Sequence, residues 1–124
     1  MKNKSLYKSF KCALEGIFVA LKEERNTKIH FTAAVVVIIL GALLRFSVEK
    51  LAILVLVCGL VVVSETFNTA IERIVDVIQP DYCPKAKIIK DISAGAVLLA
   101  AIIAVVVGVL IFGPVLIELY LRLL

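Results

Sequence analysis

The sequence predicts an all-α membrane protein, with an N-terminal amphipathic surface helix followed by three transmembrane helices. Of its 124 residues, 62% are hydrophobic, and the mean hydropathy is +1.08. A soluble domain of this size could not bury that much apolar surface. The apolar residues also occur in long runs, which indicates lipid as the solvent. We expect a single domain over residues 1–124, because three spans and one surface helix leave no room for a separate soluble catalytic domain.

Residues 5–24 show helical periodicity with one apolar side. Apolar side chains recur at spacings of three and four residues, at Leu6, Phe10, Ala13, Leu14, Ile17, Phe18 and Leu21. The charged residues of the segment lie mainly on the other side. This pattern predicts a helix lying in the membrane interface. The alternative is a soluble helix packed on a partner, which the transmembrane segment that follows disfavours.

Three further stretches are apolar enough to span a bilayer. We place them at residues 29–48, 51–78 and 92–113, with an apolar tail to residue 124. The short connection at residues 45–50 predicts that the first two spans form an antiparallel hairpin. Pro80 should end the second span, because proline commonly follows a helix C-terminus. Gly113 and Pro114 predict a kink or a break in the third.

The basic residues are distributed unevenly around a net charge of +4. Residues 1–30 and 80–91 hold most of them, namely Lys2, Lys4, Lys8, Lys11, Lys22, Arg25, Lys28, Lys85, Lys87 and Lys90. The positive-inside rule then places the N-terminus and the 80–91 loop in the cytoplasm, and the C-terminus outside. Basic segments at this surface suit anionic membrane lipids. Nucleic acid is a poor alternative partner, because no aromatic platform or basic folded module is present.

An acidic stripe in the second span is the strongest chemical signal. At about 100° per residue, Glu65, Glu72 and Asp76 point within roughly 40° of one another, and Asn68 lies about 60° to one side. Glu65 lies about 21 Å along the helix from Leu51, still at membrane depth. A carboxylate there must face a bundle interior or a wet cavity. The alternative is that these residues only hold helices together.

Position within this stripe suggests two different roles. Glu65 could act as the general base for a hydroxyl that is presented from the bilayer. The lower carboxylates lie nearer to water, where they suit a divalent cation. Magnesium takes hard oxygen ligands and often shares them with nucleotide phosphates.

Two other charged segments lie at the predicted cytoplasmic surface. Lys90 could meet polyphosphate, and Asp91 could cap the third span or hold Lys90 in place. The segment at residues 23–30 is charged and contains His30, which we interpret as an interfacial hydrogen-bonding residue rather than a metal ligand. The sequence has no P-loop, no G-x-G-x-x-G motif and no serine nucleophile elbow, so any nucleotide must be held by acids and lysines around magnesium.

These motifs resemble the small bacterial membrane lipid kinases, namely the prokaryotic diacylglycerol kinases and their undecaprenol kinase relatives. Residues 65–76 read ETFNTAIERIVD, similar to the family pattern E-x-x-N-[ST]-A-I-E-x-x-x-D. Residues 86–97 read AKIIKDISAGAV, similar to its A-K-D-x-[AS]-[AS]-A-V region. Ser9-Phe10-Lys11 and Glu24-Arg25-Asn26 resemble its N-terminal part. The resemblance covers nearly the whole chain.

The resemblance implies a homotrimer in a bacterial cell membrane, with active sites shared between subunits and with ATP and Mg²⁺ as cofactors. It implies that Glu65 activates the lipid hydroxyl and that Asn68 positions Glu65 and the phosphate. Glu24 and Glu72 would bind the magnesium. Lys90, steered by Asp91, would neutralise charge on the transferred phosphoryl group. The implied ATP-binding residues are Glu24, Glu72, Asp76, Lys90 and Asp91, and the implied lipid-binding residues are Glu65 and Ala94.

The resemblance also bears on the substrate. Residues 25–30 look like the Gram-positive branch of the family, whose members often phosphorylate undecaprenol, so we favour undecaprenol over diacylglycerol. Cys83 is a departure, because many relatives have histidine after the tyrosine that corresponds to Tyr82. Two other functions remain as alternatives: a small proton-coupled exporter that depends on one intramembrane glutamate, and a structural subunit of a larger complex.

Overall fold

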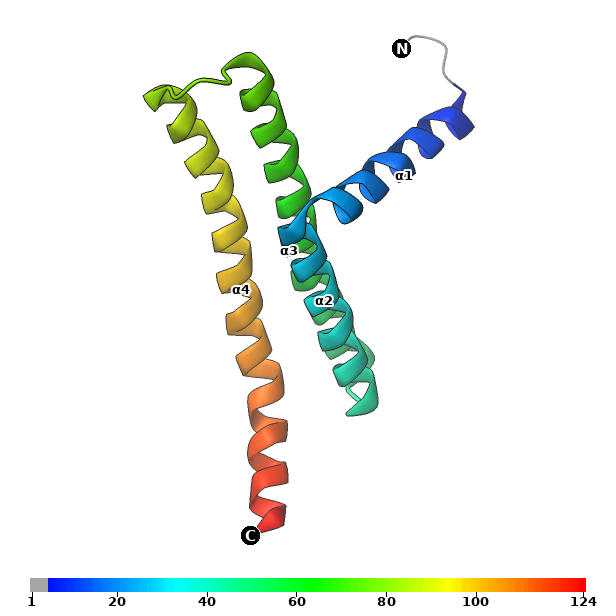
Figure 1. Cartoon of the computed structure of the whole chain (residues 1–124). Helices are drawn as coiled ribbons and strands as arrows, with labels where there is room; N and C mark the ends of the chain where they lie inside the picture. Colours follow the sequence, from blue (N-terminus) through cyan, green and yellow to red (C-terminus); the bar gives the residue numbers. More distant parts are fainter. Residues whose placement is uncertain (1–4) are drawn as a thin grey trace.

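Four helices make up the computed structural model, which describes residues 5–124 (Figure 1). They are α1 (Leu6–Glu23), α2 (Arg25–Leu43), α3 (Val48–Ile78) and α4 (Pro84–Leu123). The all-helical prediction is confirmed, and α2, α3 and α4 are each long and apolar enough to cross a membrane. Lys2 and Lys4, which entered the charge argument above, lie outside the described residues.

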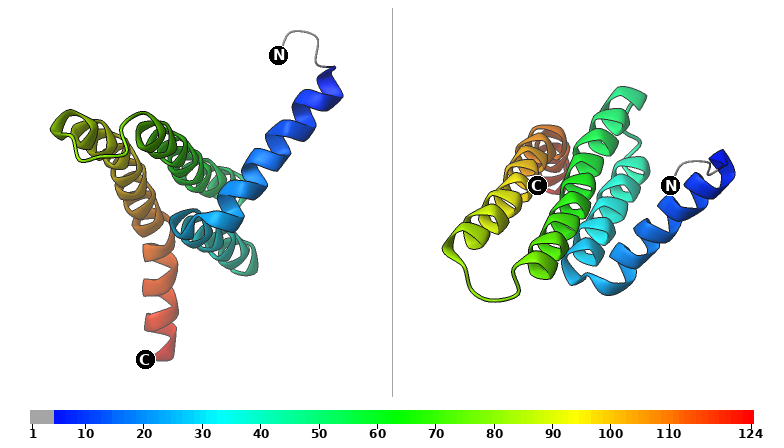
Figure 2. Two further views of the ribbon diagram at one scale, coloured as in Figure 1. Left: turned by 45° about the horizontal axis from the view of Figure 1, so that its top comes forward. Right: turned by 90° about the horizontal axis from the view of Figure 1, so that it is seen from above.

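Helix α1 projects away from the bundle at the N-terminal end of α2. The Ser5 side chain caps it by accepting a hydrogen bond from the Lys8 amide, and the extended backbone of Glu24 separates it from α2. Figures 1 and 2 show α1 pointing away from the other three helices. Its large apolar side chains, including Leu6, Phe10 and Phe18, are therefore exposed.

A tight hairpin joins α2 to α3. Arg45 takes a left-handed backbone conformation with φ 58°, and the Ser47 side chain caps α3 by accepting from the Lys50 amide. Gly41 is buried where the two helices approach, because a Cβ there would lie 3.1 Å from both Leu54 and Phe46. The predicted antiparallel hairpin is present, although α2 both begins and ends earlier than the 29–48 span.

Helix α3 lies in the middle of the bundle and packs against both α2 and α4. The backbones of α2 and α4 do not approach each other closely anywhere in residues 5–124. The right view of Figure 2 shows the same order, with α3 between its two neighbours. Packing around α3 thus leaves a space between α2 and α4.

Both ends of α4 differ from the sequence prediction. The helix begins at Pro84, well before residue 92, because proline suits the first helical turn. It also continues through Gly113 and Pro114, so of the kink or break expected there the break is absent. Proline is tolerated inside membrane helices because neighbouring groups satisfy the freed backbone carbonyl. The left view of Figure 2 shows α4 bending along its C-terminal part. By contrast, α3 ends at Ile78, as Pro80 predicted.

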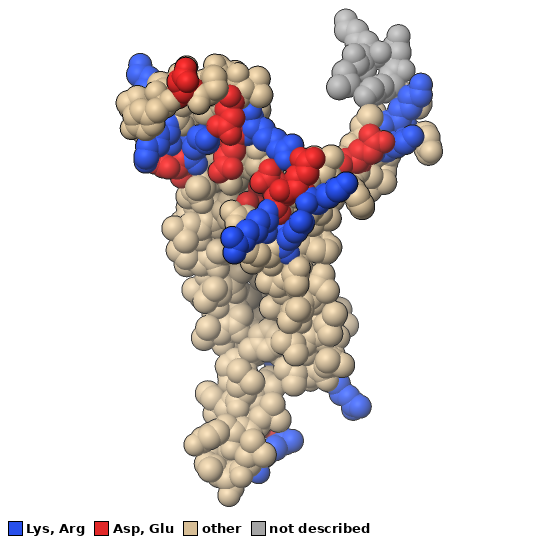
Figure 3. All heavy atoms as spheres, viewed as in Figure 1, with Lys and Arg blue, Asp and Glu red and all other residues tan. Residues whose placement is uncertain are grey.

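Charged side chains gather at one end of the molecule. Figure 3 shows them around the α3–α4 loop and the α1–α2 junction, above a long band without charge. Many large apolar residues in that band are exposed, including Leu56, Leu98 and Val105. This surface is what a protein solvated by lipid presents.

Candidate active site

The polar half of α3 becomes steadily more exposed toward its C-terminus. Glu65 is 4% exposed and Asn68 is 6% exposed, whereas Glu72 is half-buried and Asp76 is exposed. Helical spacing places all four on neighbouring parts of one face. The structure therefore buries the carboxylate that was singled out as a base and leaves the lower acids within reach of water.

Glu65 faces His30 of α2. The His30 Nε2 atom lies 3.8 Å from Glu65 Oε2, with the glutamate almost fully buried and the histidine partly exposed. The carboxylates of Glu24 and Glu72 are also close enough to act on Glu65 electrostatically. Only an interfacial role was predicted for His30, since nothing in the spacing of α2 shows which residue of α3 it will meet.

Asn68 connects α3 to α4. Its Oδ1 accepts a hydrogen bond of 2.7 Å from the buried Ser93 hydroxyl, and its Nδ2 donates a longer one, of 3.4 Å, to Glu72. Ser93 lies inside the motif at residues 86–97 but received no role from the sequence. Its hydroxyl fixes the side-chain amide of Asn68, so that oxygen faces α4 and nitrogen faces the acids of α3.

Arg73 ties the α1–α2 junction to α3. Its Nη2 atom donates to Glu23 at 2.8 Å and to Glu24 at 2.9 Å. The Arg73 guanidinium thus holds Glu24 close to the half of α3 that also contains Glu72. No role for Arg73 was predicted from the sequence, because its partners lie about fifty positions away in the chain.

The two charged residues at positions 90 and 91 have different partners from those expected. Lys90 Nζ donates to Asp76 Oδ1 at 2.6 Å, while Asp91 accepts from Lys87 at 2.6 Å. Asp91 is not the cap of α4, because the cap position belongs to Cys83. The earlier start of α4 explains both corrections: it places Lys87 and Asp91 one turn apart on the helix surface.

Ala94 is exposed, whereas its neighbour Ser93 faces α3. Ala94 is therefore accessible from outside the bundle, as the lipid contact implied by the resemblance requires.

Within residues 5–124, no cluster of three or more metal-ligating side chains is present. Glu24 and Glu72 each provide a carboxylate near Glu65, and that of Glu24 is ion-paired to Arg73. Carboxylates fit Mg²⁺, which usually retains several waters and completes its coordination with substrate phosphates rather than with an all-protein cage.

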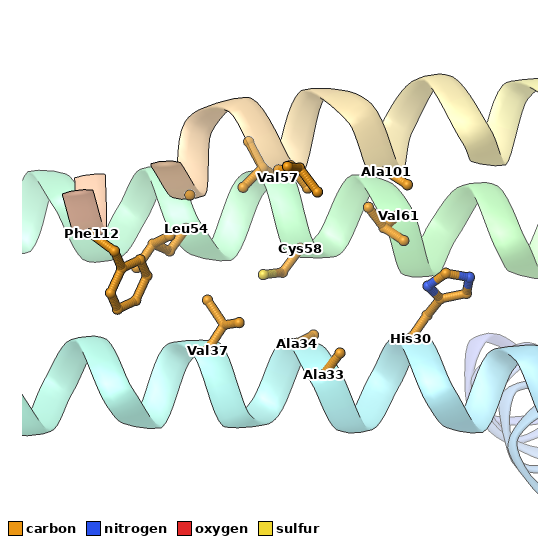
Figure 4. Close-up of a pocket in the computed structure, with 13 residues that line it drawn as sticks. His30, Ala33, Ala34, Val37, Leu54, Val57, Cys58, Val61, Ala101 and Phe112 are labelled. Carbon is orange, nitrogen blue, oxygen red and sulfur yellow. The ribbon is translucent and has the colours of Figure 1, made fainter. Parts of the chain in front are cut away.

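An apolar cavity of about 320 Å³ lies between α2, α3 and α4, where α2 and α4 stay apart (Figure 4). It is lined mainly by small and apolar side chains, including Ala34, Val37, Leu54, Val61, Ala104 and Phe112. His30 lies at one end of the cavity and Phe112 toward the other in Figure 4. The cavity therefore ends at the histidine that faces Glu65.

The geometry combines a membrane bundle, a buried carboxylate beside an apolar cavity, and paired charges at the bundle end. These are the parts that a phosphotransferase acting on a membrane lipid needs. Residues 11–112 match the family profile described as "Prokaryotic diacylglycerol kinase". The chain belongs to this family and is an ATP-using lipid kinase.

Individual relatives agree with the family. The chain is 42% identical over 108 residues to an "Undecaprenol kinase" of Bacillus subtilis (strain 168), covering 87% of this chain and 88% of that protein. It is 44% identical over 105 residues to a "Diacylglycerol kinase" of Synechocystis sp., covering 84% of this chain but only 60% of that longer protein. A "Diacylglycerol kinase" of Helicobacter pylori (strain ATCC 700392 / 26695) is 32% identical over 119 residues, covering 96% of this chain and 90% of the relative.

Proposed function

We propose that this lipid kinase phosphorylates undecaprenol to undecaprenyl phosphate, with diacylglycerol to phosphatidic acid as the second candidate. The observation that carries the proposal is the buried Glu65 carboxylate, which lies 3.8 Å from His30 at the end of an apolar cavity and beside the charged end of the bundle. The choice of lipid rests on residues 25–30, which look like the Gram-positive branch. The undecaprenol kinase relative also matches over most of both chains.

In this proposal, Glu65 accepts the proton of the lipid hydroxyl as the oxygen attacks the γ-phosphorus of ATP. The bond between that phosphorus and the β–γ bridging oxygen breaks, and its electron pair leaves with ADP. Asn68, held by Ser93, orients the groups around the phosphoryl group. Lys90 supplies positive charge, and Asp76 and Asp91 lie at the nucleotide. Positioning and charge stabilisation are the main contributions to such a transfer.

Glu24 and Glu72 are the proposed Mg²⁺ ligands. When bound, the cation neutralises charge on the nucleotide phosphates. Arg73 keeps Glu24 near α3 in the ligand-free protein, because it donates to that carboxylate directly.

We further propose that residues 1–124 form one domain that assembles as a homotrimer in the cell membrane. The apolar side of α1 would lie in the interface, and its lysines would contact anionic lipid head groups. The active site and N-terminus would be cytoplasmic and the C-terminus external, as the positive-inside rule predicts. Ala94, exposed on α4, would contact the lipid substrate at a subunit boundary.

A direct assay tests the substrate. Purified protein receives radiolabelled ATP and Mg²⁺ with undecaprenol and diacylglycerol offered in parallel, each in the same micelles. We expect label in both lipids, with a higher kcat/KM for undecaprenol. A higher kcat/KM for diacylglycerol would reverse the substrate assignment, and label in neither lipid would refute the proposal.

The other two functions considered from the sequence are not favoured. A proton-coupled exporter would need Glu65 to reach both sides of the membrane and would have no use for the ion pairs around Lys90 and Arg73. Membership of a lipid kinase family also argues against a purely structural subunit.

A further inference from the structure

His30 supplies the one imidazole at the apolar cavity, and the proposed chemistry gives it no role. Its ring lies at one end of the cavity in Figure 4, among aliphatic and small side chains. The cavity volume of about 320 Å³ lies at the lower end of the ~300–1,000 Å³ usual for ligand pockets. A hydrocarbon chain that fills it would bring its polar end to the imidazole.

The separation between His30 and Glu65 suits a shared oxygen atom. Nε2 and Oε2 are 3.8 Å apart, which is too far for a direct hydrogen bond. A single oxygen can lie about 2.8 Å from both atoms at once, which is an ordinary hydrogen-bond distance to each. Such an oxygen would lie to one side of the line that joins the two atoms, where it could bridge them.

We propose that His30 and Glu65 together bind the hydroxyl of the lipid alcohol, and that the part of its chain nearest the hydroxyl occupies the cavity. This inference rests on the lipid kinase function proposed above. The imidazole donates its Nε2 proton to the hydroxyl oxygen, and the hydroxyl donates its own proton to Glu65. One lone pair of the oxygen remains for attack on the phosphorus. His30 is thus a substrate-binding residue that orients the nucleophile, while the proton goes to Glu65.

The sequence offers a direct spectroscopic test, because His30 is the one histidine of the chain. Protein purified without a histidine tag and labelled with ¹⁵N-histidine has a single imidazole spin system. Without ATP, addition of undecaprenol or diacylglycerol should shift the Nε2 resonance. The same lipids with the hydroxyl replaced by hydrogen should leave it in place. Equal shifts from both forms, or no shift from either, would overturn the proposal.

Kinetics provide a second test with matched variants. Glutamine can place its amide nitrogen near the position of Nε2, whereas asparagine is too short and leucine has no donor. H30L and H30N should lower kcat/KM for the lipid by about tenfold, the usual effect of one lost hydrogen bond, with KM for MgATP unchanged. H30Q should retain most of the activity.

The outcomes separate this proposal from the one on which it rests. Wild-type activity with an unaffected H30L, or with H30Q as impaired as H30L, would overturn the role of His30 alone. A wild-type protein that labels neither lipid would overturn both proposals. If a variant fails to fold, the resonance test still decides the proposal, because it uses the wild-type chain.

Discussion

The two halves of α3 bury different kinds of side chain. In the first half, buried positions are aliphatic, and Leu54 is only 1% exposed where Gly41 lets α2 come close. In the second half, the buried positions are Glu65, Asn68 and Thr69. Lipid cannot satisfy buried polar groups, so the second half needs partners from α2 and α4. The first half therefore sets the distance between α2 and α3, and the second half holds the residues of the proposed chemistry.

The largest effect should follow from Glu65→Gln. Removing the proposed base should lower phosphoryl transfer by about 10³-fold, within the usual range for general-base catalysis, with little change in thermal stability. The measurement is transfer of labelled phosphate to undecaprenol. Glu49→Gln is the control, because Glu49 is an exposed acid in the first turn of the same helix. Full activity of Glu65→Gln would remove the chemical distinction between the two halves.

A smaller loss is expected for Glu72→Gln, which removes one proposed metal ligand. Activity should fall by about 100-fold, and the Mg²⁺ concentration for half-maximal rate should rise. A magnesium titration of the rate measures both quantities. Glu118→Gln, at an exposed ion pair far along α4, should behave as wild type. An unchanged magnesium requirement would contradict the assignment of Glu72.

In the apolar half, the main expected effect of Leu54→Ala is on stability. Loss of a fully buried leucine should reduce the free energy of unfolding in micelles by about 2 kcal/mol, the lower end of the range for such cavities, because lipid or detergent also solvates apolar groups. Leu56→Ala is the matched control, since Leu56 is 72% exposed. Equal thermal shifts for the two variants would argue against packing at Leu54.

The smallest effect should come from Ser93→Ala. It removes the hydrogen bond to Asn68 and should lower kcat about fivefold, equivalent to about 1 kcal/mol. Ser93→Thr keeps the hydroxyl and should retain more activity than alanine does. If alanine and threonine variants are equally active at the wild-type rate, the Asn68 amide does not need its link to α4.

Much of this arrangement follows from periodicity in the sequence. The acidic stripe was predictable, because a period of about 3.6 residues fixes which side chains share a helix face. The partners of that stripe were not. His30, Arg73 and Ser93 reach it only through the way that other helices lie on α3, and no local spacing contains that information.

The start of α4 shows a second limit. Hydropathy identifies the residues that enter the hydrocarbon core of the membrane, so it placed the start of the third span at residue 92. The helix itself begins at Pro84, in polar surroundings where hydropathy has no signal. This difference changed the interpretation of Asp91 from a cap to the partner of Lys87, and it left Lys90 to pair with Asp76.

The ion pairs at the charged end have a consequence for turnover. Lys90 is bound to Asp76, and Arg73 is bound to Glu23 and Glu24. A nucleotide that enters the proposed site must therefore exchange with anions that the protein already provides. As ADP departs, the same carboxylates can return to their cations. Such counter-ion exchange would keep Lys90 paired with an anion both before the nucleotide binds and after it leaves.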